Sequence, residues 1–280
     1  YVFGGGTVTV LFTVMAVFGA VKYLLAVTLL VRMRRETGPL RLFRGRSMVL
    51  LLLSFSLPVM MSSTVEIISR WLDKFVVSFF FGPEALGIFF VGAIEIPFIG
   101  VIISSIYSVI SPVLNSFHHD GETRKFASLA QKTLKFTSKL IWPLFAWFIV
   151  FADHLIPLVF TGDYSAAVAP FRIYLAMMPL RIASFGVLMI AMGRPRVVFW
   201  AATVSLGINF ALNILFAVMF GFVGPAIATV VSSYFHVALL LVIIVKGLGV
   251  GYADVLPWRH FFSVGVTCGF AVSIAYGVTY

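Results

Sequence analysis

Long apolar runs alternate along the chain with short polar or basic segments. The runs contain roughly 20 residues or more, enough for a helix rising about 1.5 Å per residue to cross a hydrocarbon core of about 30 Å. Strands of a barrel would be about half as long and would alternate in polarity. Because only helices and closed barrels satisfy every backbone group in lipid, the pattern predicts an all-α, polytopic membrane protein.

About eight transmembrane helices can be placed on this pattern. We expect them at about 7–31, 48–80, 84–115, 135–152, 168–192, 197–219, 225–245 and 261–280. The segment GETRKFASLAQKTLKFTSKLIW is expected to form a basic amphipathic helix on the membrane surface before the fourth span. After that span, DHLIPLVFTGDYSAA is expected to form a short interfacial helix and a loop.

The basic residues predict an orientation. Fifteen of the 20 Lys and Arg residues fall in alternate loops, and the three loops between these contain none. By the positive-inside rule the basic loops lie in the cytoplasm. The net charge of +10 then follows from topology and from attraction to anionic membrane lipids. No soluble basic domain is present that would suggest a nucleic-acid partner.

Composition agrees with this class and excludes others. Hydrophobic residues make up 61% of the 280 residues and charged residues 11%, far from the balance of a soluble domain. The single cysteine, Cys268, excludes an intrachain disulfide framework and a clustered cysteine metal site. No catalytic triad, flanking carboxylate pair or phosphate-cradling loop is evident, so we expect neither an enzyme nor a bound cofactor or metal.

Seven charged residues fall near the middle of predicted spans. They are the cations Lys22, Arg70, Lys74 and Arg181 and the anions Glu66, Asp73 and Glu95. A charged side chain facing lipid at the bilayer centre costs at least about 2.5–3.5 kcal/mol, so these residues are expected to face protein or water. At 100° per residue, the four charges between residues 66 and 74 fall on one side of their helix, within an arc of about 100°.

Two interpretations of these charges remain open. In one, opposite charges pair between packed helices, Glu66 with Arg70, and Asp73 with Arg70 or Lys74. In the other, the charges border a hydrated cavity that receives a charged substrate or a coupling ion. We favour the cavity, because a buried ion set without a function could be replaced by apolar residues without loss of stability. The excess of one cation favours an anionic ligand, and arginine suits bidentate phosphate contacts.

Several segments, in this order, resemble one transporter family. They are LDKFVVSFFFGPEALGIFFVGAIEIP, NSFHHDGETRKFASLAQKTLK, LVFTGDYSAAVAPFRIYLAMMPLRI, AMGRPRVVFWAATVSLGINFALNI and FGFVGPAIATVVSSYF. Together they resemble the polysaccharide-repeat (oligosaccharidyl-lipid) flippases of the multidrug/oligosaccharidyl-lipid/polysaccharide exporter superfamily. The resemblance covers roughly residues 47 to 245.

The resemblance implies two six-helix lobes that face each other across a central cavity. Residues 1–46 would then contain the last helix of the first lobe and a basic cytoplasmic loop, and residues 47–245 the second six-helix lobe. Residues 246–280 would add a cytoplasmic loop and one more C-terminal transmembrane helix. Because the chain begins at Tyr1, we expect it to be truncated at its N-terminus, with five helices of the first lobe upstream.

The resemblance also implies a function. The family moves polyprenyl-pyrophosphate-linked oligosaccharides across the bacterial inner membrane by alternating access, in some members coupled to an ion, and neither H⁺ nor Na⁺ is indicated here. Arg70, Lys74, Arg181 and Lys22 are the expected substrate-binding residues, and Glu66, Asp73 and Glu95 the ion-coupling or charge-pairing residues. Other membrane proteins of polysaccharide assembly are candidate partners.

Two alternatives remain beside this function. One is a cation-coupled multidrug exporter of the same superfamily, in which Glu66, Asp73 and Glu95 would bind organic cations. The other is a non-transporting membrane scaffold of a glycan-assembly complex. A scaffold would have a dry, salt-bridged interior, so access of water to the charged residues distinguishes it from a transporter.

Overall fold

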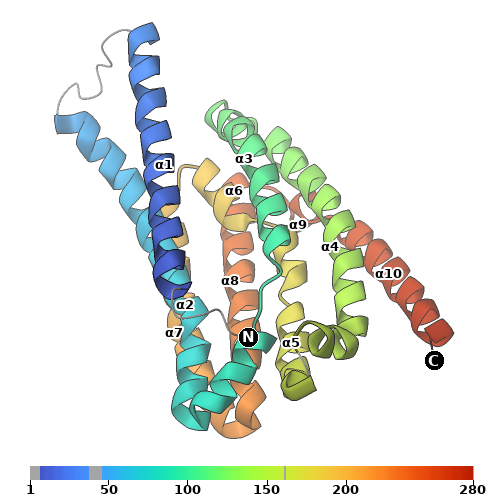
Figure 1. The fold of residues 1–280 in the computed structure, drawn as a ribbon. Helices are drawn as coiled ribbons and strands as arrows, with labels where there is room; N and C mark the ends of the chain where they lie inside the picture. Colours follow the sequence, from blue (N-terminus) through green and yellow to red (C-terminus); the bar gives the residue numbers. More distant parts are fainter. Residues whose placement is uncertain (1–6, 38–45, 161, 280) are drawn as a thin grey trace. The chain divides into compact units, whose positions relative to one another are not determined.

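The computed structural model describes residues 7–37, 46–160 and 162–279 (Figure 1). These residues form helices and no strand, which confirms the predicted all-α class. The chain divides into two compact units, Tyr1–Leu53 and Ser54–Tyr280. The first unit contains α1 (Thr7–Thr37) and the beginning of α2 (Arg46–Gly92), and the second contains the rest of α2 and all later helices.

The path of α2 reverses at Gly82. This glycine has φ 83° and ψ 177°, a conformation that residues with a Cβ rarely adopt, and Pro83 follows it. The rings of Trp71 and Phe90 lie 5.8 Å apart, whereas a straight helix would separate these residues by about 28 Å. The predicted boundary between the second and third spans is therefore found at this turn.

The predicted helix over 84–115 is wrong in its continuity. After α2 ends at Gly92, the chain leaves the helical conformation until α3 (Pro97–His119) begins. Pro97 lacks a backbone N–H and disfavours the helical conformation of the residue before it, and Ile96 is extended, with φ −77° and ψ 104°. Glu95 lies in this break.

The two elements predicted between residues 121 and 152 are a single helix. Helix α4 (Thr123–Phe160) runs for 38 residues, through the basic segment and the fourth span. It also continues past residue 152, where an interfacial helix and a loop were expected. Only the end of that segment departs from the α-helix, in the 3₁₀ helix η1 (Gly162–Ala167).

The predicted helix over 168–192 is also wrong in its continuity, like the predicted helix over 84–115. It consists of α5 (Val168–Leu175), the 3₁₀ helix η2 (Met178–Ile182) and α6 (Phe185–Ala191). The segments Gly162–Leu175 and Met178–Ala191 are bent by 43° relative to each other. Pro179 lies at this bend and cannot donate an intrahelical hydrogen bond. Arg181 is part of η2, so it too lies at a break in a helix.

The C-terminal part of the chain is a helical hairpin followed by one long helix. Its elements are α7 (Pro195–Phe220), η3 (Gly221–Val223), α8 (Gly224–Leu248), α9 (Tyr252–Val255) and α10 (Trp258–Thr279). Helices α7 and α8 pack against each other, and α10 packs against α4. Side chains from α3, α4, α6 and α8 share one large buried apolar cluster, which includes Tyr107, Phe126, Leu188 and Leu240.

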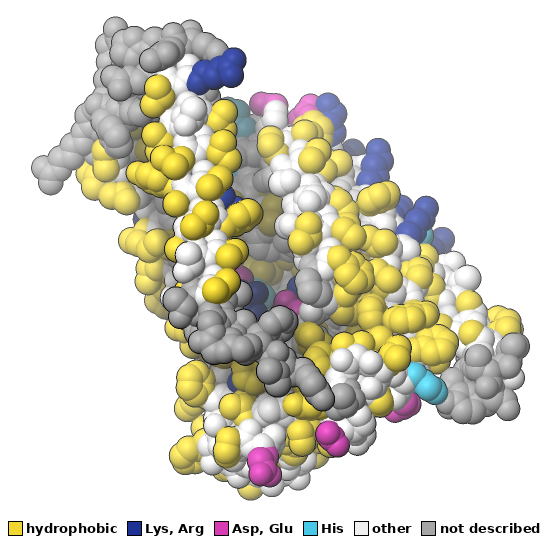
Figure 2. Space-filling view, in the orientation of Figure 1, with side chains coloured by type: hydrophobic (Ala, Val, Ile, Leu, Met, Phe, Trp, Pro, Cys, Tyr) yellow, Lys and Arg dark blue, Asp and Glu magenta, His cyan; other side chains and the backbone are white. Residues whose placement is uncertain are grey.

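The helices have the length and surface of membrane spans. Five stretches of the described residues can cross a membrane by length and composition, or six if the bent pair at 162–191 is one span. One stretch, Pro195–Leu248, includes both α7 and α8, and the number of eight spans stays a prediction. Hydrophobic side chains cover much of the visible face of the second unit (Figure 2). The chain is thus a multi-pass membrane protein.

Candidate functional site

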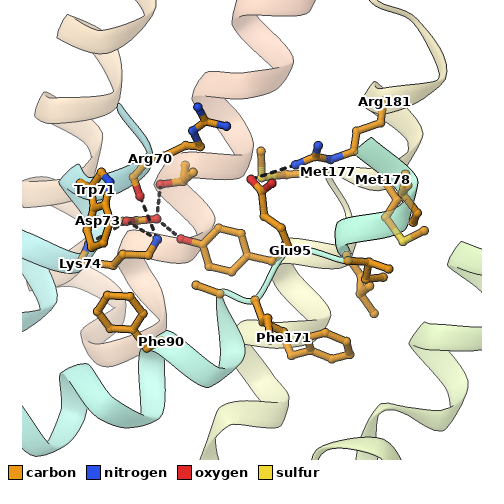
Figure 3. Close-up of a pocket in the computed structure, with 17 residues that line it drawn as sticks. Arg70, Trp71, Asp73, Lys74, Phe90, Glu95, Phe171, Met177, Met178 and Arg181 are labelled. Atoms are coloured by element: carbon orange, nitrogen blue, oxygen red, sulfur yellow. Dashed lines mark hydrogen bonds and ion pairs between the residues drawn. The ribbon is translucent and has the colours of Figure 1, made fainter. Parts of the chain in front are cut away.

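A cavity of about 270 Å³ lies among α2, α5, η2 and α8 of the second unit. Its charged lining residues are Arg70, Asp73, Lys74, Glu95 and Arg181 (Figure 3). Trp71, Phe90 and Phe171 are among its aromatic lining residues. Five of the seven predicted charged residues therefore meet at one place, from segments up to about 110 residues apart.

Asp73 is the anchor of a polar cluster in this cavity. Its side chain is 1% exposed, and one carboxylate oxygen accepts a hydrogen bond from Lys74 Nζ at 3.0 Å. The other oxygen accepts hydrogen bonds from the hydroxyls of Tyr174 and Thr229, the latter at 3.3 Å. Because these partners lie on α2, α5 and α8, the carboxylate ties three helices together. The pairing of Asp73 with Lys74 was one of the open alternatives, and it is found here.

Arg181 forms a second ion pair, with Glu95. Arg181 Nη2 lies 2.9 Å from Glu95 Oε1, and the two side chains are 34% and 51% exposed. Figure 3 shows the two side chains pointing toward each other from the two helix breaks. This pair is partly exposed, whereas the pair of Asp73 and Lys74 is largely enclosed.

Arg70 differs from the other cations of the cavity. Its carbonyl oxygen accepts a hydrogen bond from Lys74 Nζ at 2.9 Å, and the residue is exposed. Within residues 46–160 and 162–279, its guanidinium has no carboxylate within ion-pair distance. Among the described residues, Arg70 is therefore a cation whose guanidinium donors have no carboxylate partner, and it lines the cavity.

A larger cavity of about 670 Å³ adjoins the first, since Arg70, Glu95, Met177, Arg181 and Thr229 line both. Hydroxyl groups dominate its polar lining. They come from Ser69, Ser104, Tyr107, Ser108, Ser111, Ser184, Ser205, Thr229, Ser232 and Ser233. Glu66 and His236 also line this cavity. His236 Nδ1 lies 3.1 Å from the Ser205 hydroxyl, which connects α7 with α8.

Six of the seven predicted charged residues line one or both cavities. Lys22 is the exception, because it lies on α1 in the first unit. Its ammonium group is 4.8 Å from the centre of the Phe18 ring, a cation–π contact within the same helix. A role for Lys22 in substrate binding stays a prediction.

The hydroxyl groups and Tyr174 were missed at the level of sequence. The sequence does contain a pattern that indicates the hydroxyl residues. Three helices carry polar residues at i, i+3, i+4 and i+7, the spacing of one helical face. These stripes are Glu66, Ser69, Arg70 and Asp73 on α2; Ser104, Tyr107, Ser108 and Ser111 on α3; and Thr229, Ser232, Ser233 and His236 on α8. Tyr174 has no such pattern around it. In the described part of the chain, no group of three His, Cys, Asp or Glu residues is arranged to hold a metal.

Comparison with known families decides where the chain belongs. Residues 6–169, more than half of the chain, match the family described as polysaccharide biosynthesis protein. The chain is a member of this family. The match covers α1, α2, α3 and α4, so it includes the charged face of α2.

Two flippases resemble this polysaccharide biosynthesis protein. A probable low-salt glycan biosynthesis flippase of Haloferax volcanii, Agl15, is 24% identical over 168 residues, which are 58% of this chain and 35% of the relative. The solved structure of the lipid II flippase MurJ in its inward closed conformation has a TM-score of 0.65 and 18% identity. That match covers 85% of this chain and 50% of the other, so the chain spans half or less of both proteins. The fold of this family member resembles the part of MurJ that it matches.

Proposed function

We propose that the protein moves polyprenyl-pyrophosphate-linked oligosaccharide repeat units across the bacterial inner membrane by alternating access, for polysaccharide export. It would act as a transporter, without a chemical step. The observation that carries this proposal is the shared lining of the two cavities. Arg70 and Arg181, from helices distant in sequence, border the same hollow, and neither is enclosed in a dry ion pair.

The small cavity suits a pyrophosphate group. Arg70 has free donors, and Arg181 can be reached by water, so both can offer bidentate contacts to phosphate oxygens. Lys74 adds a positive charge but is 15% exposed and engaged with Asp73, so it acts mainly through the field it creates. The aromatic side chains around these cations exclude part of the water and strengthen the interaction.

The larger cavity suits sugars. The hydroxyls of Ser104, Ser108, Ser232 and Ser233 donate to backbone carbonyls of their own helices. Their oxygens therefore keep lone pairs that can accept hydrogen bonds from saccharide hydroxyls. A ligand with a pyrophosphate next to an oligosaccharide would match the order of the two cavities, and its polyprenyl tail can stay in lipid.

In the small cavity three cations face two carboxylates, which supports an anionic ligand over the organic cations of a multidrug exporter. Two of the three carboxylates, Asp73 and Glu95, are paired with cations. Glu66 alone among them has no ion pair in the described part of the chain. A dry scaffold is disfavoured by two cavities that are lined with charged and hydroxyl side chains.

We also propose that the basic end of the second unit faces the cytoplasm. Gln131 Nε2 donates to the carbonyl of Ala253 at 2.8 Å, and His260 Nε2 lies 3.2 Å from the carbonyl of Lys135. The basic N-terminal half of α4 thereby contacts α9 and the beginning of α10. Several Lys and Arg side chains gather at the upper right of this unit in Figure 2. One basic end is what the positive-inside rule requires of a single orientation.

The proposal is tested by removing the two arginines. Arg70→Ala and Arg181→Ala are each expected to reduce polysaccharide export at least about tenfold, since each removes a charged donor pair from the phosphate group. Export is measured in cells that lack the native protein, at matched amounts of variant in the membrane.

Arg172→Gln is the matched control. Arg172 belongs to the same broken span, but it pairs with Asp153 at 2.5 Å and lines neither cavity. The Arg172→Gln variant loses the same charge as each alanine variant and should export polysaccharide normally. Normal export by both alanine variants would contradict the proposed function.

A further inference from the structure

We propose that Glu95 is an internal counter-ion that occupies Arg181 in the empty protein, is displaced by an arriving phosphate group, and promotes release of that group by returning to Arg181. The inference rests on the proposed function for the nature of the anion. It assigns to Glu95 a role in positioning and release rather than in binding the substrate.

The two ion pairs of the cavity differ in how easily they exchange. Asp73 is 1% exposed and holds Lys74, Tyr174 and Thr229 at once, so opening that pair would leave a buried carboxylate without partners. Glu95 is 51% exposed, and Arg181 is its only ion-pair partner in the part of the chain that the structure describes. Water can replace either partner of this second pair, so an anion can exchange with Glu95 at low cost.

The backbone around the second pair also allows exchange. Glu95 lies between α2 and α3, and Arg181 lies in η2 between α5 and α6. A shift of either residue does not require breaking the hydrogen-bond ladder of a continuous helix. Both side chains line both cavities. They therefore lie where the small cavity, proposed for phosphate, meets the larger cavity, proposed for sugars.

Charge balance gives Glu95 an effect on affinity. The charged side chains of the larger cavity are Glu66 and Glu95 against Arg70 and Arg181, a balanced set. Without Glu95, this cavity has one excess cation, and Arg181 has free donors before any ligand arrives. An anion would then bind more tightly and leave more slowly, because no internal carboxylate competes for the same guanidinium.

The first test is the affinity of the purified protein, in lipid nanodiscs, for inorganic pyrophosphate. Glu95→Gln is expected to bind pyrophosphate about three- to tenfold more tightly than the wild type, the range for removal of one exposed competing charge. Asp153→Asn is the matched control, because it removes the carboxylate of the exposed Asp153–Arg172 pair, which lines neither cavity. Its affinity should equal that of the wild type.

The second test separates release from structure. With lipid-linked substrate in vesicles, Glu95→Gln should lower both the half-saturating substrate concentration and the maximal rate of translocation, because release becomes slower. An ion pair that only holds the fold would, when broken, weaken binding as well. Weaker or unchanged pyrophosphate affinity of Glu95→Gln overturns the inference.

Chemical labelling of Arg181 distinguishes failure of this inference from failure of the proposed function. Phenylglyoxal, which modifies free guanidinium groups, should label Arg181 faster in Glu95→Gln than in the wild type, as measured by peptide mass spectrometry. If labelling rises but no variant binds pyrophosphate, the exchangeable pair stands and the proposed ligand is wrong. If labelling does not rise, the counter-ion role of Glu95 is wrong, whatever the ligand.

Discussion

At the scale of single residues, Asp73 shows how a carboxylate is held inside a membrane helix bundle. An ionised group in a low-dielectric interior is tolerated when a counter-charge and hydrogen-bond donors surround it. Asp73 has Lys74 for charge and the Tyr174 and Thr229 hydroxyls for hydrogen bonds. Its cluster is therefore a structural tie between helices, and it leaves Arg70 and Arg181 as the cations that a ligand can reach.

Removal of this carboxylate should destabilise the protein. Asp73→Asn leaves the Lys74 ammonium without its counter-charge, which costs about 3 kcal/mol for a buried pair and lowers the Tm by about 5–10 °C. Tyr174→Phe, which removes one hydrogen bond and no charge, should lower the Tm by about 2–4 °C. Both values can be measured by thermal unfolding of the purified protein in detergent.

A double variant shows whether charge is the cause. Asp73→Asn combined with Lys74→Met removes both charges and should recover most of the lost Tm, because the unpaired ammonium is gone. A double variant as unstable as Asp73→Asn alone would mean that the hydrogen bonds of Asp73, and not its ion pair, stabilise the cluster.

The candidate site could be predicted in part from single residues. Helical spacing and the cost of charge in lipid were enough to select Glu66, Arg70, Asp73, Lys74, Glu95 and Arg181, all of which line the cavities. The sequence favoured a cavity over pairing between charges, whereas the structure contains both. Whether a given acid meets a given base depends on helix rotation and on the breaks at residues 93–96 and 178–183, and spacing does not specify these.

At the scale of elements, the hairpin of α7 and α8 depends on one close approach. A Cβ at Gly224 would lie 1.9 Å from the carbonyl oxygen of Phe216, although the backbone of Gly224 is ordinary, with φ −53° and ψ −49°. The glycine is therefore required by space and not by conformation. Thr229, which completes the Asp73 cluster, lies five residues further along α8.

Gly224→Ala should therefore damage the hairpin. The backbone of Phe216 would have to move, at a cost of about 1–3 kcal/mol, and the Tm should decrease by about 5 °C or more. Gly207→Ala, in α7 of the same hairpin, meets no atom within 4 Å and should keep or slightly raise the Tm. Equal Tm values for the two variants would show that α8 can move away from α7 without loss.

Element boundaries could be predicted where composition changes, and not where helices break inside an apolar run. The turn at Gly82 and the hairpin around Gly221 were found from glycine and proline at the ends of apolar runs. The breaks near Pro97 and Pro179 could not be distinguished from simple bends, because prolines also occur within unbroken membrane helices, as Pro143 and Pro157 do in α4. Tertiary packing decides whether a helix breaks at a proline or continues through it.

At the scale of the whole molecule, polar stripes from α2, α3 and α8 meet around two adjoining cavities inside an otherwise apolar helical unit. In the proposed function, the charged stripe supplies cations for a phosphate group, and the hydroxyl stripes supply acceptors for sugars. The similarity to the fold of MurJ and membership of the polysaccharide biosynthesis family agree with these two polar cavities. The central claim is that these charges border water within the membrane.

Cysteine labelling tests that claim directly. In a background with Cys268→Ser, cysteines are introduced as Arg70→Cys, Arg181→Cys and, as a control, Phe75→Cys, whose native side chain is 70% exposed and apolar. A water-soluble maleimide is applied to open membranes, so that it reaches both faces. The account predicts rapid labelling at positions 70 and 181 and slow labelling at position 75. Protection of positions 70 and 181, at the level of position 75, would contradict it.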